Sequence, residues 1–146
     1  MKTTFIRNIK LSDKEDWQKL YRGYAKFYNI EMTQTILNTV WSWLIDERHE
    51  LNGLVCEFEK NIIALAHYRR MPSPLRGKNI GFLDDLFVSS KFRGLGIGEK
   101  IILKLNEISK TNGWNLVRWI TRSDNLKAKS LYDRVSIKTN WEVYEL

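Results

Sequence analysis

A basic, glycine-rich turn between two apolar segments constrains this chain more than any other feature. Residues 79–88 predict a strand, and the apolar positions of residues 97–108 recur at helical spacing. The turn between them carries Arg93 and glycines at positions 94, 96 and 98. Glycines let a ligand approach the backbone closely, and the first amides of a helix lack intrahelical acceptors. The segment therefore predicts an anion site, and a pyrophosphate is the expected guest.

Two common glycine motifs overlap this turn without fitting it. A Walker loop needs Lys and then Ser or Thr directly after its last glycine, but Glu99 follows Gly98 here. A dinucleotide fingerprint needs its third glycine where Glu99 stands, and it lies in the first βα unit of its fold rather than past the middle of the chain. Nucleoside triphosphate, NAD and FAD are therefore disfavoured as ligands.

The pattern Arg93-x-x-Gly96-x-Gly98 resembles the coenzyme A pyrophosphate loop of the GNAT acetyltransferases. The context is similar to the family over about the last two thirds of the chain, with a strand at 116–121 and then a helix that carries Asn125, Ala128 and Tyr132. Segments 83–88 and 140–144 look most like the spermidine/spermine and the Hpa-type histone and polyamine acetyltransferases.

This resemblance implies one α/β (α+β) domain over residues 1–146 with the GNAT fold. The expected architecture is a mixed sheet of about six to seven strands with splayed central strands and about four flanking helices. The sequence itself predicts a capping box at Ser12 before a first helix, a second helix from Thr33 or Thr35, and a hairpin at residues 59–60. Prolines at 72 and 74 are expected to end a strand, and residues 141–145 to form the last one.

In the family, acetyl-CoA binds the edge of the central strand, the glycine turn and the helix that follows. Carried over to this chain, the cofactor-binding residues are Leu86, Phe87, Val88, Arg93, Gly94, Leu95, Gly96, Ile97, Gly98, Asn125, Ala128 and Lys129. A backbone amide near Phe87 or Val88 is expected to donate to the thioester oxygen, where negative charge develops during attack. The alternative, that the strand residues only build the core, is compatible because their backbone does the binding.

Three side chains are the candidates for catalysis and acceptor binding. Tyr132 is expected to be the general acid for the departing thiolate, since a phenol is protonated at neutral pH; the alternative is a packed ring. Asp84 and Asp85 are expected to bind the cationic amine. The resemblance to the polyamine acetyltransferases implies that Asp84 takes its proton, and a water chain is the alternative. Neighbouring strand residues face opposite ways, so a bulge is needed for both to reach one pocket. The alternative is that one of the two aspartates is a structural acid paired with a local Lys or Arg. His67 is the second choice as proton acceptor, and His49 is expected at the surface.

The predicted function is direct acetyl transfer from acetyl-CoA to a primary amine, with a polyamine or a lysine-like acceptor. An aminoglycoside, an amino acid or a protein N-terminus remains open as acceptor, as does a non-catalytic acetyl-CoA-binding module. The tryptophans at 17, 41 and 43 are interpreted as core or dimer-face residues rather than substrate-lining ones.

Composition limits the other classes of function. The 146 residues carry 24 Lys and Arg against 17 Asp and Glu, but the basic residues are scattered, so no nucleic-acid partner is expected. One cysteine, Cys56, and two distant histidines offer no metal-ligand spacing. The sequence has no apolar run of about 18 residues or signal peptide, so a cytoplasmic protein without membrane contact is predicted. By family resemblance, a homodimer is expected.

Overall fold

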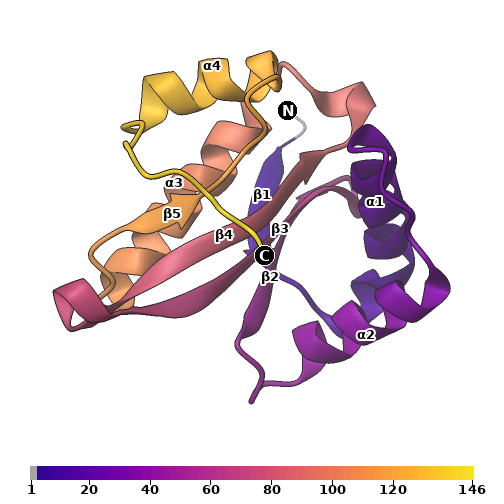
Figure 1. Cartoon of the computed structure of the whole chain (residues 1–146). Helices are drawn as coiled ribbons and strands as arrows, with labels where there is room; N and C mark the ends of the chain where they lie inside the picture. The colour runs from indigo at the N-terminus through magenta and orange to yellow at the C-terminus, as the bar shows by residue number, and fades with distance from the viewer. Residues whose placement is uncertain (1–2) are drawn as a thin grey trace.

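The computed structural model describes residues 3–146 as a mixed sheet with helices on both faces (Figure 1). In chain order the elements are β1 (Thr4–Asn8), α1 (Lys14–Phe27), α2 (Gln34–Ile45), β2 (Leu51–Phe58), β3 (Asn61–Ser73), β4 (Lys78–Val88), α3 (Ile97–Thr111), β5 (Val117–Trp119) and α4 (Leu126–Val135). Short 3-10 turns at Leu11–Asp13, Pro74–Arg76 and Ser90–Phe92 join some of them. The α/β class and the four helices agree with the sequence prediction.

The strand order follows the chain, β1-β2-β3-β4-β5, and only the last pair is parallel. The parallel step requires a crossover, and α3 provides it. The predicted hairpin at residues 59–60 is confirmed, because Glu59 and Lys60 have φ values of 50° and 66° and Phe58 pairs with Asn61. Two consecutive residues with positive φ match the right-handed twist of the flanking strands.

The side chains of the central strands alternate between two cores. Val55 and Leu65 pack with Trp17, Leu37 and other apolar residues of α1 and α2 on one face. Leu54, Cys56, Ala64 and Ala66 pack with Ile97, Ile101 and Leu105 of α3 on the opposite face. Figure 1 shows α1 and α2 on one side of the sheet and α3 and α4 on the other. The period of two in the strands therefore places the two helical layers.

The central strands splay apart, as the resemblance to the GNAT family implies. β5 pairs with β4 only from Gly81 to Leu83, whereas β4 continues to Val88 with β3 as its paired neighbour. One edge of β4 between Asp84 and Val88 thus has no strand beside it among residues 3–146. This open edge leads directly into the glycine turn.

The prediction of six to seven strands is wrong for the described chain, which has five. The expected strand at residues 141–145 has no regular secondary structure, and Trp141 and Tyr144 are 72% and 87% exposed. Its alternating pattern is typical of a strand, but no strand of the same chain lies beside it to complete the hydrogen-bond ladder within residues 3–146. β5 is also shorter than the predicted 116–121.

The beginnings of the helices agree only in part with the sequence. Thr33 caps α2 by accepting a hydrogen bond from the Ile36 amide at 3.1 Å, which confirms one of the two predicted starts. The capping box at Ser12 is wrong, because the carboxylate that accepts the turn amide belongs to Asp13, which bonds the Lys10 amide at 2.8 Å. The prediction that Pro72 ends a strand is also wrong, since Pro72 pairs with Asn79 inside β3.

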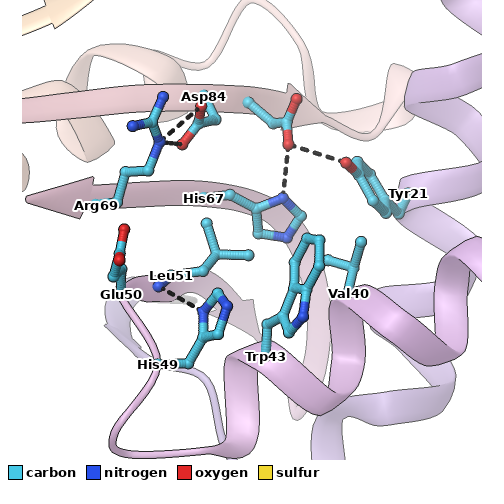
Figure 2. A pocket seen from close by; sticks show the side chains of 10 residues that line it. Tyr21, Val40, Trp43, His49, Glu50, Leu51, His67, Arg69 and Asp84 are labelled. Carbon is cyan, nitrogen blue, oxygen red and sulfur yellow. Dashed lines mark hydrogen bonds and ion pairs between the residues drawn. The ribbon is translucent and has the colours of Figure 1, made fainter. Parts of the chain in front are cut away.

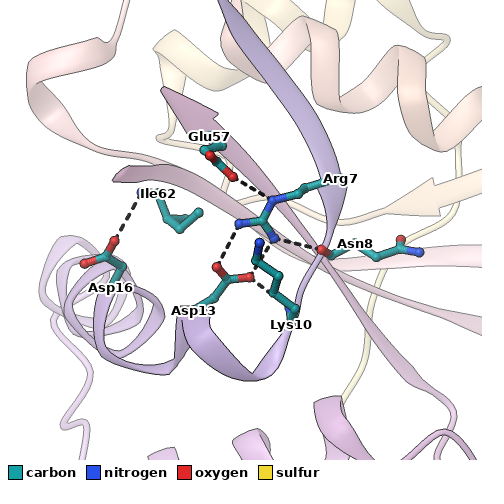
Figure 3. Close-up of polar contacts among 7 residues, drawn as sticks. All are labelled: Arg7, Asn8, Lys10, Asp13, Asp16, Glu57 and Ile62. Carbon is teal, nitrogen blue, oxygen red and sulfur yellow. Dashed lines mark hydrogen bonds and ion pairs between the residues drawn. The ribbon is translucent and has the colours of Figure 1, made fainter. Parts of the chain in front are cut away.

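An ion cluster holds this first turn to the sheet (Figure 3). Both terminal nitrogens of Arg7 on β1 donate to Asp13 at 2.8 Å, and the Arg7 Nε donates to Glu57 on β2 at 2.8 Å. Asp13 is 4% exposed, so its charge depends on these partners. Burial acts to raise the pKa of Asp13, but the bonds from Arg7 and Lys10 outweigh it and hold the pKa below its usual value.

Candidate active site

A cavity of about 360 Å³ opens between α1, α2 and the sheet (Figure 2). Its lining residues come from α1, α2, the turn before β2, the start of β2, and strands β3 and β4: Tyr21, Val40, Trp43, His49, Glu50, Leu51, His67, Arg69, Asp84 and Asp85. The two aspartates predicted to bind the acceptor therefore line one cavity.

A β-bulge in β4 brings the two neighbouring carboxylates together. His67 of β3 pairs with Asp85, but Tyr68 pairs with Leu83, so Asp84 is an extra residue without a partner in the β3 register. A regular strand would point these side chains to opposite faces, and the extra residue removes that alternation locally. The bulge that the sequence analysis required is present.

Asp85 accepts several hydrogen bonds at the inner end of the cavity. Its Oδ2 accepts from the Tyr21 hydroxyl at 3.0 Å and contacts His67 Nδ1 at 2.8 Å. Burial acts to raise the pKa of Asp85, but the bonds from His67, Tyr24 and Tyr21 outweigh it, so the pKa lies below its usual value. Asp85 is therefore a stable anion at neutral pH.

Asp84 lies in a different electrostatic environment. The Nε of Arg69 reaches both of its oxygens, at 3.0 and 3.3 Å, and the guanidinium also lies 4.8 Å from the ring centre of Phe82. Burial raises the pKa of Asp84 above its usual value, and the charge of Asp85 adds to this rise although Arg69 opposes it. Of the two acids, Asp84 is the one more ready to accept a proton.

Several cavity residues were missed or misjudged from the sequence. His49, expected at the surface, lines the cavity and stacks on Trp43 with ring centres 5.1 Å apart. Trp43 is 41% exposed there rather than in the core, whereas Trp17 and Trp41 are buried as predicted. Arg69 had no sequence signal beyond its place one strand from Asp84. Tyr21 could be found only as part of the aromatic face of the first helix.

Two glycines of the turn have a left-handed backbone. Gly94 and Gly96 have φ values of 79° and 76°, and α3 begins at Ile97 directly after Gly96. Only glycine adopts this region without steric cost. Gly98 lies in the first turn of the helix, and a Cβ there would come within 3.3 Å of Leu131 on α4. Leu95 is exposed, whereas the Ile97 side chain is buried, so Ile97 can offer only its backbone to a ligand.

Arg93 points back toward the end of β4. Its Nε donates to the Val88 carbonyl at 3.0 Å, and its guanidinium lies 5.6 Å from the ring centre of Phe27 and 5.3 Å from that of Phe87. The side chain thus links the turn to the open strand edge and to α1.

The backbone groups on the open edge of β4 can be assigned by alternation. The Ser89 amide donates to Ile63 on the β3 side, so the polar groups of Phe87 face β3 as well. Those of Leu86 and Val88 then face the splayed edge. The contact of Arg93 with the Val88 carbonyl agrees with this assignment.

The predicted residues of α4 lie on the far side of the splay. Tyr132 is half-buried, its ring centre is 5.3 Å from that of Trp119, and burial raises the pKa of its phenol to about 12. Asn125 precedes the helix and donates to the Tyr28 hydroxyl at 3.2 Å. Ala128 is half-buried, and Lys129 donates to the Ser123 carbonyl at 3.2 Å.

Neither a metal cluster nor a membrane-spanning helix is found in the described part of the chain. Residues 3–146 contain no group of three or more His, Cys, Asp or Glu side chains arranged to hold a metal ion. None of their helices has the length and apolar character needed to cross a membrane.

The chain is similar to known acetyltransferases in sequence and structure. Over 142 residues it is 28% identical to the D-amino-acid N-acetyltransferase HPA3 of Saccharomyces cerevisiae, covering 96% of this chain and 88% of the relative. It is 28% identical over 144 residues to thialysine N-epsilon-acetyltransferase of Mus musculus, covering 90% and 82%. The aminoglycoside N-acetyltransferase AAC(6')-Iy, solved with CoA, shares the fold with a TM-score of 0.87 at 14% identity, covering 100% of this chain and 95% of that one.

The family profile described as acetyltransferase (GNAT) matches residues 14–136, which include the cavity residues, the glycine turn and the helix of Tyr132. The chain therefore belongs to the GNAT family and is an N-acetyltransferase that uses acetyl-CoA.

Proposed function

We propose that this protein transfers the acetyl group of acetyl-CoA directly to a primary amine, which binds as a cation in the cavity beside Asp84 and Asp85. A polyamine or a lysine-like side chain is the expected acceptor. The observation that carries the proposal is the bulge at Asp84, because it lets two adjacent carboxylates line the same cavity. A strand that only builds a core has no use for two half-buried acids in succession.

The two carboxylates suit different steps. An alkyl amine has a pKa of about 10 and arrives as an ammonium ion, and the anion of Asp85 attracts it. The amine must then lose a proton before its nitrogen can attack. Asp84, whose pKa is raised, accepts that proton more readily than Asp85, whose pKa is lowered. Water at the cavity mouth then carries the proton away.

The open edge of β4 supplies the donor for the developing charge. Attack by the amine nitrogen on the thioester carbonyl carbon puts negative charge on the carbonyl oxygen. The Val88 amide faces the splayed edge and is the proposed donor to that oxygen, in preference to the Phe87 amide, which faces β3. The first amides of α3, after Gly96, are the proposed donors to the pyrophosphate.

Tyr132 completes the transfer as the proposed acid. When the bond between carbonyl carbon and sulfur breaks, the thiolate needs a proton, and the phenol remains protonated at neutral pH because its pKa is about 12. The attacking nitrogen loses its second proton as it becomes the amide, this proton restores the Tyr132 phenol, and free coenzyme A leaves as the thiol.

A second acceptor class is favoured by Arg69. Only its Nε bonds Asp84, and its two terminal nitrogens take part in no hydrogen bond among residues 3–146. A guanidinium with available donors in the cavity suits a carboxylate. An amino acid could place its ammonium at Asp85 and its carboxylate at Arg69. The relatives that act on D-amino acids and on thialysine support including such acceptors.

A thiol-release assay over a panel of amines tests the proposal. The panel comprises spermidine, a lysine peptide, thialysine, D-amino acids and an aminoglycoside. We expect turnover with at least one cationic amine. The kcat/KM for that amine should fall by at least about tenfold in both Asp84→Asn and Asp85→Asn. Asp133→Asn on the exposed surface of α4 is the control. Turnover that survives both cavity substitutions would refute the proposed acceptor site, and selective loss of amino acids in Arg69→Met would identify the second class.

A further inference from the structure

A buried histidine at the inner end of the cavity has both ring nitrogens engaged. The His67 side chain is 1% exposed, and its Nδ1 lies 2.8 Å from Asp85 Oδ2. Its Nε2 lies 2.9 Å from the indole nitrogen of Trp17, a residue of α1 that is fully buried. The chain Trp17, His67, Asp85 therefore runs from the core to the cavity wall.

The chemistry of the indole decides where the imidazole proton lies. Trp17 has only an N–H and can only donate, so His67 Nε2 must present its lone pair. The single ring proton is then on Nδ1, from which it is donated to Asp85. A second proton on Nε2 would face the indole N–H and break that hydrogen bond. His67 is therefore neutral and held in one tautomer, and it is not available as the base that the sequence offered as second choice.

We propose that Trp17 is a positioning residue for the acceptor site, because it keeps His67 neutral and so leaves the negative charge of Asp85 available to the amine. A charged imidazolium at 2.8 Å would pair with Asp85 and neutralise it. A neutral imidazole orients the carboxylate through a hydrogen bond without cancelling its charge. This inference rests on the proposed role of Asp85 as the anchor for the ammonium ion.

The groups that face this pair come from every neighbouring element. Tyr21 and Tyr24 on α1 donate to Asp85 and add no charge. Arg69 on β3 is directed to Asp84, and His49 and Glu50 lie on the cavity wall before β2. His49 is thus the other histidine of the cavity, and any pH experiment must separate it from His67.

Nitrogen NMR of the unmodified protein tests the tautomer without any substrate. Two-bond ¹⁵N–¹H correlations distinguish a proton on Nδ1 from one on Nε2. We expect His67 to show the Nδ1–H form at neutral pH, because the indole N–H can bond only to a lone pair on Nε2. A proton on Nε2, or an imidazolium at neutral pH, would overturn the inference, whatever amine the enzyme acetylates.

Kinetics of Trp17→Phe test the consequence for the acceptor. Without the indole N–H, His67 can gain a second proton. When the pH is lowered from about 8 to about 6, the KM for the amine should therefore increase about tenfold more in this variant than in the parent protein. The same experiment in a His49→Gln background removes the other titrating ring. Trp41→Phe is the matched control, since Trp41 is buried with its ring centre 5.2 Å from that of Trp17 but shares no hydrogen bond with His67.

A double substitution tests whether the extra pH dependence comes from His67. In Trp17→Phe combined with His67→Asn, the amide can still donate to Asp85 but cannot titrate, so the extra pH dependence should vanish. If Trp17→Phe shows the same pH dependence of KM as Trp41→Phe, the positioning role is refuted. If Trp17→Phe does not fold, the NMR measurement on the parent protein decides. Absence of acetylation by the parent protein would instead count against the proposed function.

Discussion

Tyr21 and Asp85 lie 64 residues apart in the sequence and share a 3.0 Å hydrogen bond at the inner end of the cavity. Tyr21→Phe removes this donor while keeping a ring that lies 4.7 Å from His67 in an edge-on contact. The pKa of Asp85 should then rise toward its ordinary value, and the KM for the amine should increase about tenfold, since one hydrogen bond to a charged group is worth ~1.5 kcal/mol.

The kcat should change little, because the reacting atoms are not contacted. Steady-state kinetics against Tyr144→Phe, whose ring is exposed in the C-terminal segment, provide the comparison. An unchanged KM in Tyr21→Phe would mean that this hydrogen bond does not prepare Asp85 for the acceptor.

Tyr132→Phe should lower kcat by about a hundredfold or more, while the affinity for acetyl-CoA stays within about twofold, because only the acidic proton is lost. The pKa of Tyr132 is raised to about 12, so kcat of the parent enzyme should show no alkaline fall from this group below about pH 11. Isothermal titration with acetyl-CoA separates binding from chemistry. A normal kcat in Tyr132→Phe would exclude the phenol as the acid.

The sequence could predict those parts of the site that depend on local backbone chemistry. The glycines at 94 and 96 permit the positive φ values found there, and the alternation of β2 and β3 places the two cores. It could not predict the cavity wall, because Tyr21, His49, Arg69 and Asp85 line one cavity only after α1, the turn before β2, β3 and β4 have packed together. The missing strand at 141–145 has a related cause. An alternating pattern shows that a segment suits a sheet, but it does not name the neighbour that must complete its hydrogen bonds.

Gly96→Ala should weaken acetyl-CoA binding by more than its loss of folding stability would explain. At φ 76° an alanine costs about 1 kcal/mol, and relief of that strain moves the amides that open α3. Gly77→Ala is a matched control, since Gly77 has a φ of 60° and, like Gly96, has open space within 4 Å of the point where a Cβ would lie. Both variants should lose similar stability in urea, but only Gly96→Ala should lose affinity in a calorimetric titration. Equal affinities would remove the glycine turn from the cofactor site.

Asp13→Asn should destabilise the protein at neutral pH but not in acid. The pKa of Asp13 in the folded state lies below the unfolded value, so its contribution is complete above about pH 5 and is lost as the pH falls through the folded pKa. Loss of a buried partner of Arg7 is expected to cost about 3 kcal/mol at pH 7. Urea unfolding from pH 7 to pH 3 should show the two free-energy curves converging. A gap that is independent of pH would mean that the charge of Asp13 is not what stabilises the turn.

The exposed C-terminal segment bears on the homodimer that family resemblance predicts. Trp141, Val143 and Tyr144 are 72%, 63% and 87% exposed in a segment without regular structure, so a second copy of the chain could cover these apolar side chains. Analytical ultracentrifugation should show a dimer for the parent protein and a shift toward monomer for Trp141→Ser combined with Tyr144→Ser. Leu75→Ser, which removes an apolar side chain that is 91% exposed near the β3–β4 turn, should leave the dimer intact. A monomeric parent protein, or a dimer that tolerates both tail substitutions, would refute this interface.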